Sequence, residues 1–268
     1  MAPPNPVALL DLATSLATKA GAAVMDVRAE AVRTADTKSS PTDPVTEGDR
    51  LAESIVVDGI LVERPDDGII GEEGTDRPGT SGVRWFIDPI DGTTNYLYGL
   101  PAYGVSIGAE VDGVMTSAVV LNPATGELFA ATIGGGARCN GRSIAVSGGQ
   151  RLDEALIATG FGYRPERRRH QAAVLAELLP RIRDIRRMGS AALDLCAVAA
   201  GRVDAYYERG LNSWDYAAGW LIATEAGAVC GNLRGGPPDE HFLVAATPGL
   251  HGPVTDALVG LDADGPEG

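Results

Sequence analysis

Apolar residues recur at helical spacing in two long segments near the start of the chain. Across residues 7–30 and again across residues 45–62 they return every three or four positions, which predicts two amphipathic helices. The polar stretch between them, residues 34–44, contains two prolines and predicts a loop. The first part of the chain is therefore expected to be a pair of helices.

The pattern then changes to short apolar runs and to alternation of apolar and polar residues. Residues 69–70 and 83–87 predict short strands, and residues 103–133 predict a meander of strands divided by turns. The remainder predicts strands at 156–159, 184–186 and 203–207 and helices at 167–179, 190–200 and 214–227. Because strands and helices mix throughout, the expected fold class is α/β or α+β, built in layers.

The length and charge of the chain limit its organisation and partners. With 268 residues and no repeat or linker, we expect one domain over 1–262, made of two fused halves at 1–150 and 151–262. The polar end, residues 263–268, is expected to be a disordered tail. A net charge of −14 argues against nucleic-acid binding, which depends on Lys and Arg meeting phosphates, and is compatible with the binding of cations.

The cysteines and the first residues bear on the cellular compartment. Cys139, Cys196 and Cys230 are far apart and odd in number, so neither a disulfide framework nor a zinc site is predicted. The first residues lack the basic start and long apolar core of a signal peptide. No window is expected to span a membrane, and we expect a soluble, cytoplasmic protein with no membrane partner.

Two carboxylates mark the end of one apolar run, in the sequence WFIDPIDGTTNY at residues 85–96. Asp88 and Asp91 stand three positions apart, and such close carboxylates repel each other unless a cation lies between them. Oxygen ligands favour hard ions such as Mg²⁺. The Gly-Thr-Thr that follows is typical of a helix start, whose free N–H groups bind phosphate. The alternative is an Asx-turn with a helix cap and no chemistry.

Acidic residues also stand at other predicted element ends. Glu72 and Glu73 follow the strand at 69–70 in the same manner, and Asp215 opens the last predicted helix. Asp49 opens the second helix, where it alone would be an ordinary first-turn residue. These positions strengthen the prediction of a cation site.

The separated motifs together resemble the inositol monophosphatase family of metal-dependent phosphatases. They occur in the family's order at 43–49 (DPVTEGD), 71–73 (GEE), 85–96 (WFIDPIDGTTNY), 214–219 (WDYAAG) and 225–227 (EAG). The resemblance implies a five-layer αβαβα sandwich, two to three Mg²⁺ ions at each active site, inhibition by Li⁺ and a homodimer.

The resemblance also implies roles for individual residues. It implies a first metal site at Glu72, Asp88 and the Ile90 carbonyl. It implies a second metal site at Asp88, Asp91 and Asp215. Gly92 and Thr93 would contact the phosphate through backbone N–H groups.

Further roles follow from the same resemblance. Thr93, supported by Asp49 and Glu72, would orient the attacking water. Glu208 matches a glutamate that contacts substrate hydroxyls, with a surface carboxylate as the alternative. Lys38, within residues 37–41, matches a mobile loop near the site.

The sequence departs from the family's pattern beside the second motif. Tyr98 stands where the family often has a histidine, three positions after Asn95, and the region of Asn212 and Ser213 also varies. Because none of these residues is an implied metal ligand, the departures concern the identity of the substrate.

Two other features have ordinary explanations. The run Gly134 to Ala137 lacks the spacing and the lysine of a P-loop, so a hairpin or connection is favoured. The basic run from Arg164 to His170 could contact a polyanionic substrate or a partner, but a solvated helix start is favoured.

The function expected from these features is Mg²⁺-dependent hydrolysis of inositol monophosphate or a similar small phosphate monoester. A second hypothesis keeps the mechanism and changes the substrate to histidinol phosphate, fructose 1,6-bisphosphate or 3′-phosphoadenosine phosphates. A third is a regulatory binding protein that retains the phosphatase fold.

Overall fold

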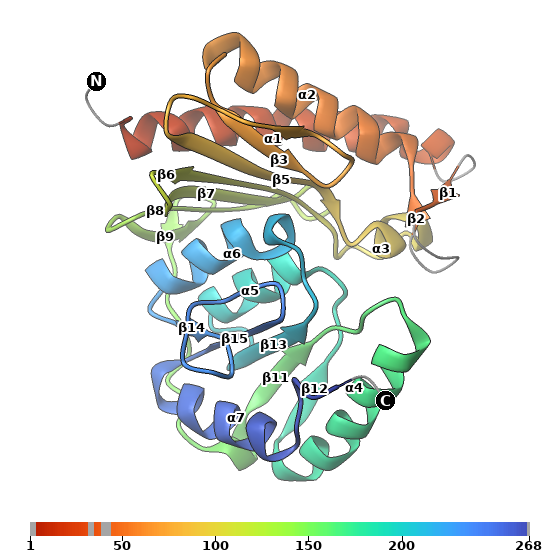
Figure 1. The fold of residues 1–268 in the computed structure, drawn as a ribbon, viewed down its shortest axis with the longest axis vertical. Helices are drawn as coiled ribbons and strands as arrows, with labels where there is room; N and C mark the ends of the chain where they lie inside the picture. The colour runs from red at the N-terminus through yellow and green to blue at the C-terminus, as the bar shows by residue number, and fades with distance from the viewer. Residues whose placement is uncertain (1–3, 32–34, 39–43, 267–268) are drawn as a thin grey trace.

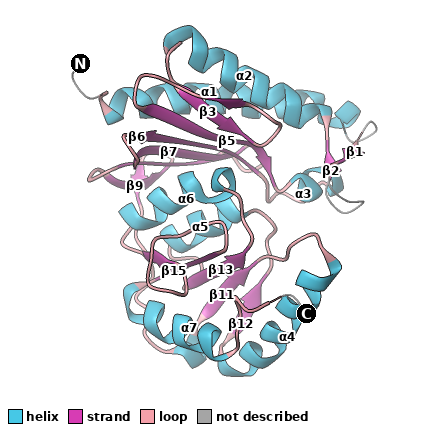
Figure 2. Cartoon of the chain, in the orientation of Figure 1, coloured by secondary structure: helices cyan, strands magenta, loops and turns pink. Residues whose placement is uncertain are grey.

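The computed structural model describes residues 4–31, 35–38 and 44–266 of the chain. Its helices and strands alternate in five layers, helix–sheet–helix–sheet–helix, as Figures 1 and 2 show. The five-layer sandwich expected from the sequence is confirmed.

The first layer is the predicted pair of helices, α1 (Pro6–Ala31) and α2 (Glu47–Glu63). Their apolar stripes pack on each other and on one face of the large sheet, where Leu16, Val24 and Val56 are buried. Thr46 caps α2 and exchanges hydrogen bonds with Asp49 in a capping box, which fixes the start of this helix.

The second layer is an eight-stranded sheet with the strand order β10-β9-β8-β7-β6-β5-β3-β4. All neighbours in it are antiparallel except β3 and β5, which are parallel. Its strands are β3 (Gly68–Gly71), β4 (Asp76–Arg77), β5 (Val83–Asp91), β6 (Gly104–Val111), β7 (Val114–Asn122), β8 (Glu127–Thr132), β9 (Gly136–Cys139) and β10 (Arg142–Ser143). A separate two-stranded sheet pairs β1 (Asp36–Thr37) with β2 (Pro44–Val45).

The second half of the chain forms a smaller sheet with the order β12-β11-β13-β15-β14. β11 is parallel to both β12 and β13, whereas β15 is antiparallel to its two neighbours. The strands are β11 (Leu156–Thr159), β12 (Asp184–Arg186), β13 (Ala205–Arg209), β14 (Val229–Gly231) and β15 (Phe242–Ala246). The helices of this half are α4 (Pro165–Leu178), α5 (Ala191–Ala199), α6 (Ser213–Glu225) and α7 (Pro248–Gly260), with 3₁₀ turns at Leu152–Glu154 and Leu179–Arg181.

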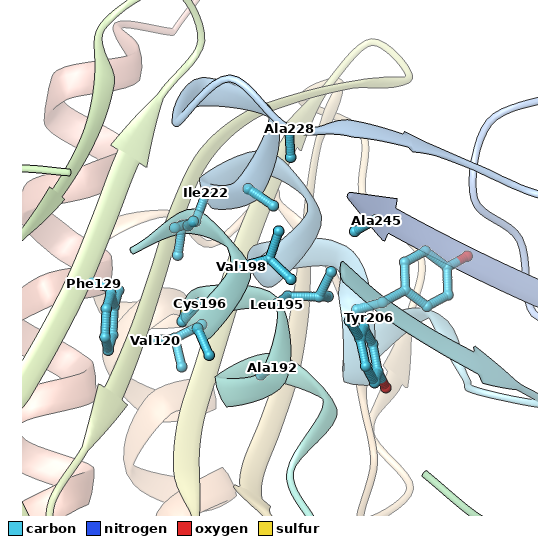
Figure 3. Close-up of a cluster of buried hydrophobic side chains, with 14 of the residues drawn as sticks. Val120, Phe129, Ala192, Leu195, Cys196, Val198, Tyr206, Ile222, Ala228 and Ala245 are labelled. Atoms are coloured by element: carbon cyan, nitrogen blue, oxygen red, sulfur yellow. The ribbon is translucent and has the colours of Figure 1, made fainter. Parts of the chain in front are cut away.

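Helices α5 and α6 form the central layer and join the two sheets (Figure 3). Phe129 and Val120 of the large sheet and Tyr206 of the small sheet face Leu195 and Ile222 of these helices. Helices α4 and α7 cover the outer face of the small sheet. Because one apolar cluster spans both sheets, the two halves share a core.

Strand β5 differs from its prediction in a way that matters for the site. The sequence places Asp88 at the strand end and Asp91 on a loop, but the strand continues through Pro89 to Asp91. Its pairing with β6 shifts between Asp88 and Asp91, which marks a bulge. Both carboxylates are therefore held by the sheet, with α3 (Thr93–Tyr98) following directly.

Helix α1 corrects another expectation. By length and composition alone, Pro6–Ala29 is apolar enough to cross a membrane, so the expectation that no window approaches such a run is wrong by this measure. Its face with Leu9, Ala13 and Leu16 is nevertheless packed in the protein core, as in the core helix of a globular protein.

The chain end is folded further than the sequence predicts. Ala263 is buried, and the Gly265 carbonyl accepts a hydrogen bond of 2.5 Å from Arg209 Nη1. Residues 263–265 therefore pack on the small-sheet half and do not form a free tail. Residues 267–268 lie outside the described residues.

Candidate active site

A cleft of about 790 Å³ opens between residues of the two halves, beside α3. Six of the predicted site residues line it: Glu72, Asp91, Gly92, Thr93, Glu208 and Asp215. They come from the ends of β3 and β5, the start of α3, strand β13 and the first turn of α6. The structure thus gathers residues more than a hundred positions apart into one cavity of the size that takes a small molecule.

Asp88 lies buried beneath the cleft and is 2% exposed. Its Oδ1 accepts a hydrogen bond of 3.1 Å from the Ile90 N–H, which holds the carboxylate against the strand. Burial, followed by the charges of Glu72, Asp91 and Asp215, raises its pKa well above the ordinary value. A carboxylate in such surroundings is stabilised as an anion by a nearby cation.

Asp91 connects the two halves of the molecule. The Ser190 hydroxyl, at the N-cap of α5, donates to Asp91 Oδ2 at 2.6 Å, and the Ala192 N–H donates to the same oxygen at 2.6 Å. Burial raises the pKa of Asp91 to about 7, although these two hydrogen bonds oppose the rise. Neither Ser190 nor Ala192 is predicted as a site residue from the sequence, where the local signal is only that Ser190 can cap a helix.

Asp215 lies in the first turn of α6 and is half-buried. The Asn212 N–H donates to its Oδ2 at 2.7 Å within a capping box, so the helix start fixes the side chain. Burial and the charges of Glu72 and Asp91 raise its pKa well above the ordinary value.

Thr93 and Asp49 form a second group beside the acidic one. The Thr93 hydroxyl lies 3.1 Å from Asp49 Oδ1 and 3.0 Å from the Ile90 carbonyl oxygen. Asp49 Oδ2 accepts hydrogen bonds from the Thr46 N–H at 2.8 Å and the Thr46 hydroxyl at 2.5 Å. Burial raises the pKa of Asp49 to about 6. Tertiary contact thus joins the α2 cap to the start of α3.

Lys38 reaches the acidic end of the cleft from the segment before α2. Its Nζ lies 2.9 Å from Glu72 Oε1 and 2.5 Å from Glu73 Oε1. Burial lowers the pKa of Lys38, but the two carboxylates outweigh burial and raise the pKa above its ordinary value. The rest of the predicted loop, residues 39–41, and Asp43 of the first motif lie outside the described residues.

Glu208 occupies the small-sheet side of the cleft. The Tyr206 hydroxyl donates to its Oε2 at 2.7 Å, and Gly160 leaves room for the carboxylate, because a Cβ at that position would overlap it. Burial raises the pKa of Glu208, while this hydrogen bond and the charge of Arg187 oppose the rise. The carboxylate is held in place beside the acidic group.

The predicted metal ligands are all oxygen donors. Within residues 4–31, 35–38 and 44–266, no three acidic, His or Cys side chains converge closely enough to hold one ion as they stand. The charges of Glu72, Asp91 and Asp215 nevertheless act on Asp88 and raise its pKa, and those of Glu72 and Asp91 raise the pKa of Asp215. Their oxygen-only donor set fits a hard divalent ion such as Mg²⁺.

Two of the remaining sequence motifs have structural roles. Glu225, at the end of α6, accepts hydrogen bonds of 2.8 Å from the N–H groups of both Gly134 and Gly136. The glycine run is the turn between β8 and β9, as the sequence favours, and Gly227 follows α6 with a φ of 97°.

Known proteins resemble this chain over most of its length. The family model described as the inositol monophosphatase family matches residues 6–259. The inositol-1-monophosphatase SuhB of Mycobacterium tuberculosis is 45% identical, over 95% of this chain and 94% of its own. The Nus factor SuhB of Salmonella typhimurium is 40% identical, over 85% and 86%. The crystal structure of the extragenic suppressor protein suhB from Bartonella henselae superposes with a TM-score of 0.88 at 36% identity, over 94% and 98%.

Proposed function

Because the chain belongs to the inositol monophosphatase family, we propose that it hydrolyses inositol monophosphates or similar small polyol phosphates with the help of Mg²⁺. The observation that carries the proposal is the gathering of Glu72, Asp91, Thr93 and Asp215 around one cleft, above buried Asp88. A phosphate monoester is a dianion, and bare carboxylates would repel it. The acidic group is therefore suited to such a substrate only with cations present.

The residues that would hold Mg²⁺ are Glu72, Asp88, Asp91 and Asp215, together with the Ile90 carbonyl. When bound, two to three such ions supply positive charge that acidifies a water and neutralises the leaving oxygen. The hydrogen bonds from Ser190 and Ala192 hold the Asp91 carboxylate in place through its Oδ2.

Other residues of the chain position the reactants. The Thr93 hydroxyl, between Asp49 and the Ile90 carbonyl, is placed to orient a water, with Asp49 as the acceptor of the hydroxyl proton. The backbone N–H groups of Gly92 and Thr93 bind the phosphate. Glu208 accepts hydrogen bonds from substrate hydroxyls, and Lys38 adds positive charge at the acidic end.

A different function is supported by one observation among the relatives. The Salmonella protein that is 40% identical is named a Nus factor. A regulatory binding protein with the phosphatase fold is therefore the second candidate, and the net charge of −14 favours a protein partner over direct nucleic-acid contact.

The decisive experiment is a panel of phosphate esters assayed with Mg²⁺, with Ca²⁺ and with excess chelator. We expect hydrolysis of inositol monophosphate with Mg²⁺, little with Ca²⁺ because it prefers larger and looser coordination, and none with chelator. Inhibition by Li⁺ is also expected. Full activity in chelator would exclude the metal mechanism, and no hydrolysis of any ester would favour the regulatory candidate.

We further propose a cytoplasmic homodimer without a membrane or nucleic-acid partner. Light scattering at micromolar concentration tests the dimer, and a mass equal to the 27.7 kDa monomer would exclude it.

A further inference from the structure

Glu72 reaches the cleft from the turn that joins β3 to β4. The Glu72 N–H donates to the Ile87 carbonyl of β5 at 3.1 Å, which continues the pairing of β3 with β5. The Gly71 N–H donates to the Thr75 carbonyl at 2.7 Å and closes the turn. The N–H groups of Glu73 and Thr75 are bonded by a side chain from another layer of the fold.

That side chain is Glu53, on helix α2. Its Oε2 accepts a hydrogen bond of 2.7 Å from the Glu73 N–H. Its Oε1 accepts hydrogen bonds from the Thr75 N–H at 3.2 Å and from the Thr75 hydroxyl at 2.6 Å. Glu53 is only 5% exposed, and a carboxylate is costly to bury unless donors surround it. Both oxygens of one buried carboxylate therefore hold the turn.

Two glycines make this contact possible. A Cβ on Gly71 would lie 2.7 Å from Glu53 Cδ, closer than packed side chains approach, so the glycine lets the carboxylate reach the backbone of the turn. Gly74 has a φ of 107°, a conformation that glycine adopts without strain. The close approach and the course of the turn each depend on a glycine.

The position of the Glu72 carboxylate follows from this turn, because its neighbours on both sides are fixed. Gly71 is held by Thr75, and Glu73 is held by Glu53. Lys38 Nζ lies 2.9 Å from Glu72 Oε1 and 2.5 Å from Glu73 Oε1. A cationic group thus lies against the carboxylates that the turn presents.

We propose that Glu53 is a positioning residue for the predicted Mg²⁺ site at Glu72, and that by holding the turn it sets the affinity of this site for the ion. Glu53 itself is not part of the cleft lining. Side chains that hold a metal ligand from behind commonly change metal affinity by about 10- to 100-fold. The inference rests on the metal dependence of the proposed function.

The test measures Mg²⁺ binding to the metal-free protein by calorimetry. Glu53→Gln keeps the size of the side chain but replaces one accepting oxygen with an NH₂ group, so one N–H of the turn loses its acceptor. We expect the Kd for Mg²⁺ to rise about tenfold or more. In an ester assay, the Mg²⁺ concentration needed for half-maximal rate should rise in parallel, while kcat at saturating Mg²⁺ changes little.

Two further variants separate geometry from charge. Gly71→Ala keeps every charge but displaces the Glu53 carboxylate, and it should weaken Mg²⁺ binding as Glu53→Gln does. Thr75→Val removes one donor to Glu53 and should weaken binding less. Glu63→Gln removes the same charge from the exposed end of α2, and this matched control should bind Mg²⁺ as the parent does.

Urea denaturation in the presence of chelator measures the effect of each change on the fold without metal. A merely structural role would lower the free energy of unfolding and leave the Kd for Mg²⁺ of the folded protein unchanged. If Glu53→Gln does not fold, Gly71→Ala and the milder Thr75→Val decide the question.

The outcomes separate this inference from the phosphatase proposal. Parent-like Mg²⁺ affinity in the folded variants overturns the positioning role, whereas ester hydrolysis by the parent still supports the phosphatase. Weaker binding in Glu53→Gln with parent-like binding in Gly71→Ala assigns the effect to charge and also overturns it. Mg²⁺ binding that depends on Glu53 and Gly71, with no ester hydrolysed, supports the inference while the phosphatase proposal fails. A parent that binds no Mg²⁺ overturns both.

Discussion

The guanidinium of Arg28, near the end of α1, donates two hydrogen bonds to the carbonyl oxygen of Tyr96, of 3.0 Å from Nε and 2.7 Å from Nη2. Tyr96 lies within α3, the short helix that follows Asp91. Its hydroxyl in turn donates to the Val24 carbonyl at 2.8 Å. The first helix therefore holds the element that carries Thr93, although it supplies no residue to the cleft lining.

Arg28→Met should destabilise the protein and lower turnover. The change removes both hydrogen bonds from a charged donor and keeps most of the apolar stem, so we expect a loss of about 1.5–3 kcal/mol in the free energy of unfolding. Urea denaturation measures it, with kcat and KM determined separately. Lys19→Met, exposed on the same helix, is the control. A variant with the parent's stability and kcat would show that the contact does not support α3.

Asp91→Asn should retain the fold and lose most of its turnover. The amide keeps the shape but removes a negative charge from the group that would hold Mg²⁺, and losing a charged ligand costs several kcal/mol of transition-state stabilisation. Asp88→Asn should be at least as severe, because that carboxylate would contribute to both proposed metal sites.

Steady-state kinetics across a Mg²⁺ titration measure both effects, and calorimetry measures Mg²⁺ affinity independently. Asp58→Asn, on the exposed face of α2, serves as the control. Activity of Asp91→Asn within about threefold of the parent, roughly 0.7 kcal/mol, would make Asp91 a structural residue only.

Thr93→Val should lower kcat while leaving the size of the side chain unchanged. The loss removes a hydroxyl placed between Asp49 and the Ile90 carbonyl, and it leaves the buried Asp49 oxygen without that donor. A hydrogen bond to a charged group contributes about 1.5–3 kcal/mol, or about 10- to 150-fold in rate. Thr93→Ser should recover most of the activity. Equal losses in both variants would assign the effect to packing of the methyl group.

Glu208→Gln should reduce kcat/KM for an inositol phosphate by about 10- to 150-fold, because a charge-assisted hydrogen bond to a hydroxyl is weakened. An aryl phosphate offers no hydroxyl there and should lose little. Glu166→Gln, an exposed residue of α4, is the control. Equal losses of kcat/KM on both substrates would mean that Glu208 supports the site or the fold. No loss on either substrate would mean that Glu208 has no role in binding or catalysis.

The sequence by itself determined the local elements and the acidic motifs. Helical spacing predicted α1 and α2, and the start of α3 followed from the Gly-Thr-Thr after Asp91, because these signals depend on neighbours a few positions apart. The motifs also supported the family, which the match over residues 6–259 confirms. Elements with weak local signals were missed, namely the strands β1, β2, β4, β9, β10, β14 and β15 and the helix α7, the last with Pro253 inside it.

The tertiary structure alone decided which distant residues meet. The contact of Asp91 with Ser190 joins positions 99 apart in the chain. The packing of Arg167 against Gly210 depends on β11 and β13 lying side by side in the small sheet. Local sequence does not predict such pairs, because the same helix caps and glycines occur in many different folds and do not specify which distant residue they contact. Arg187 and Glu208 reach the same cleft because parallel β11, β12 and β13 deliver their carboxyl ends to one edge of the sheet.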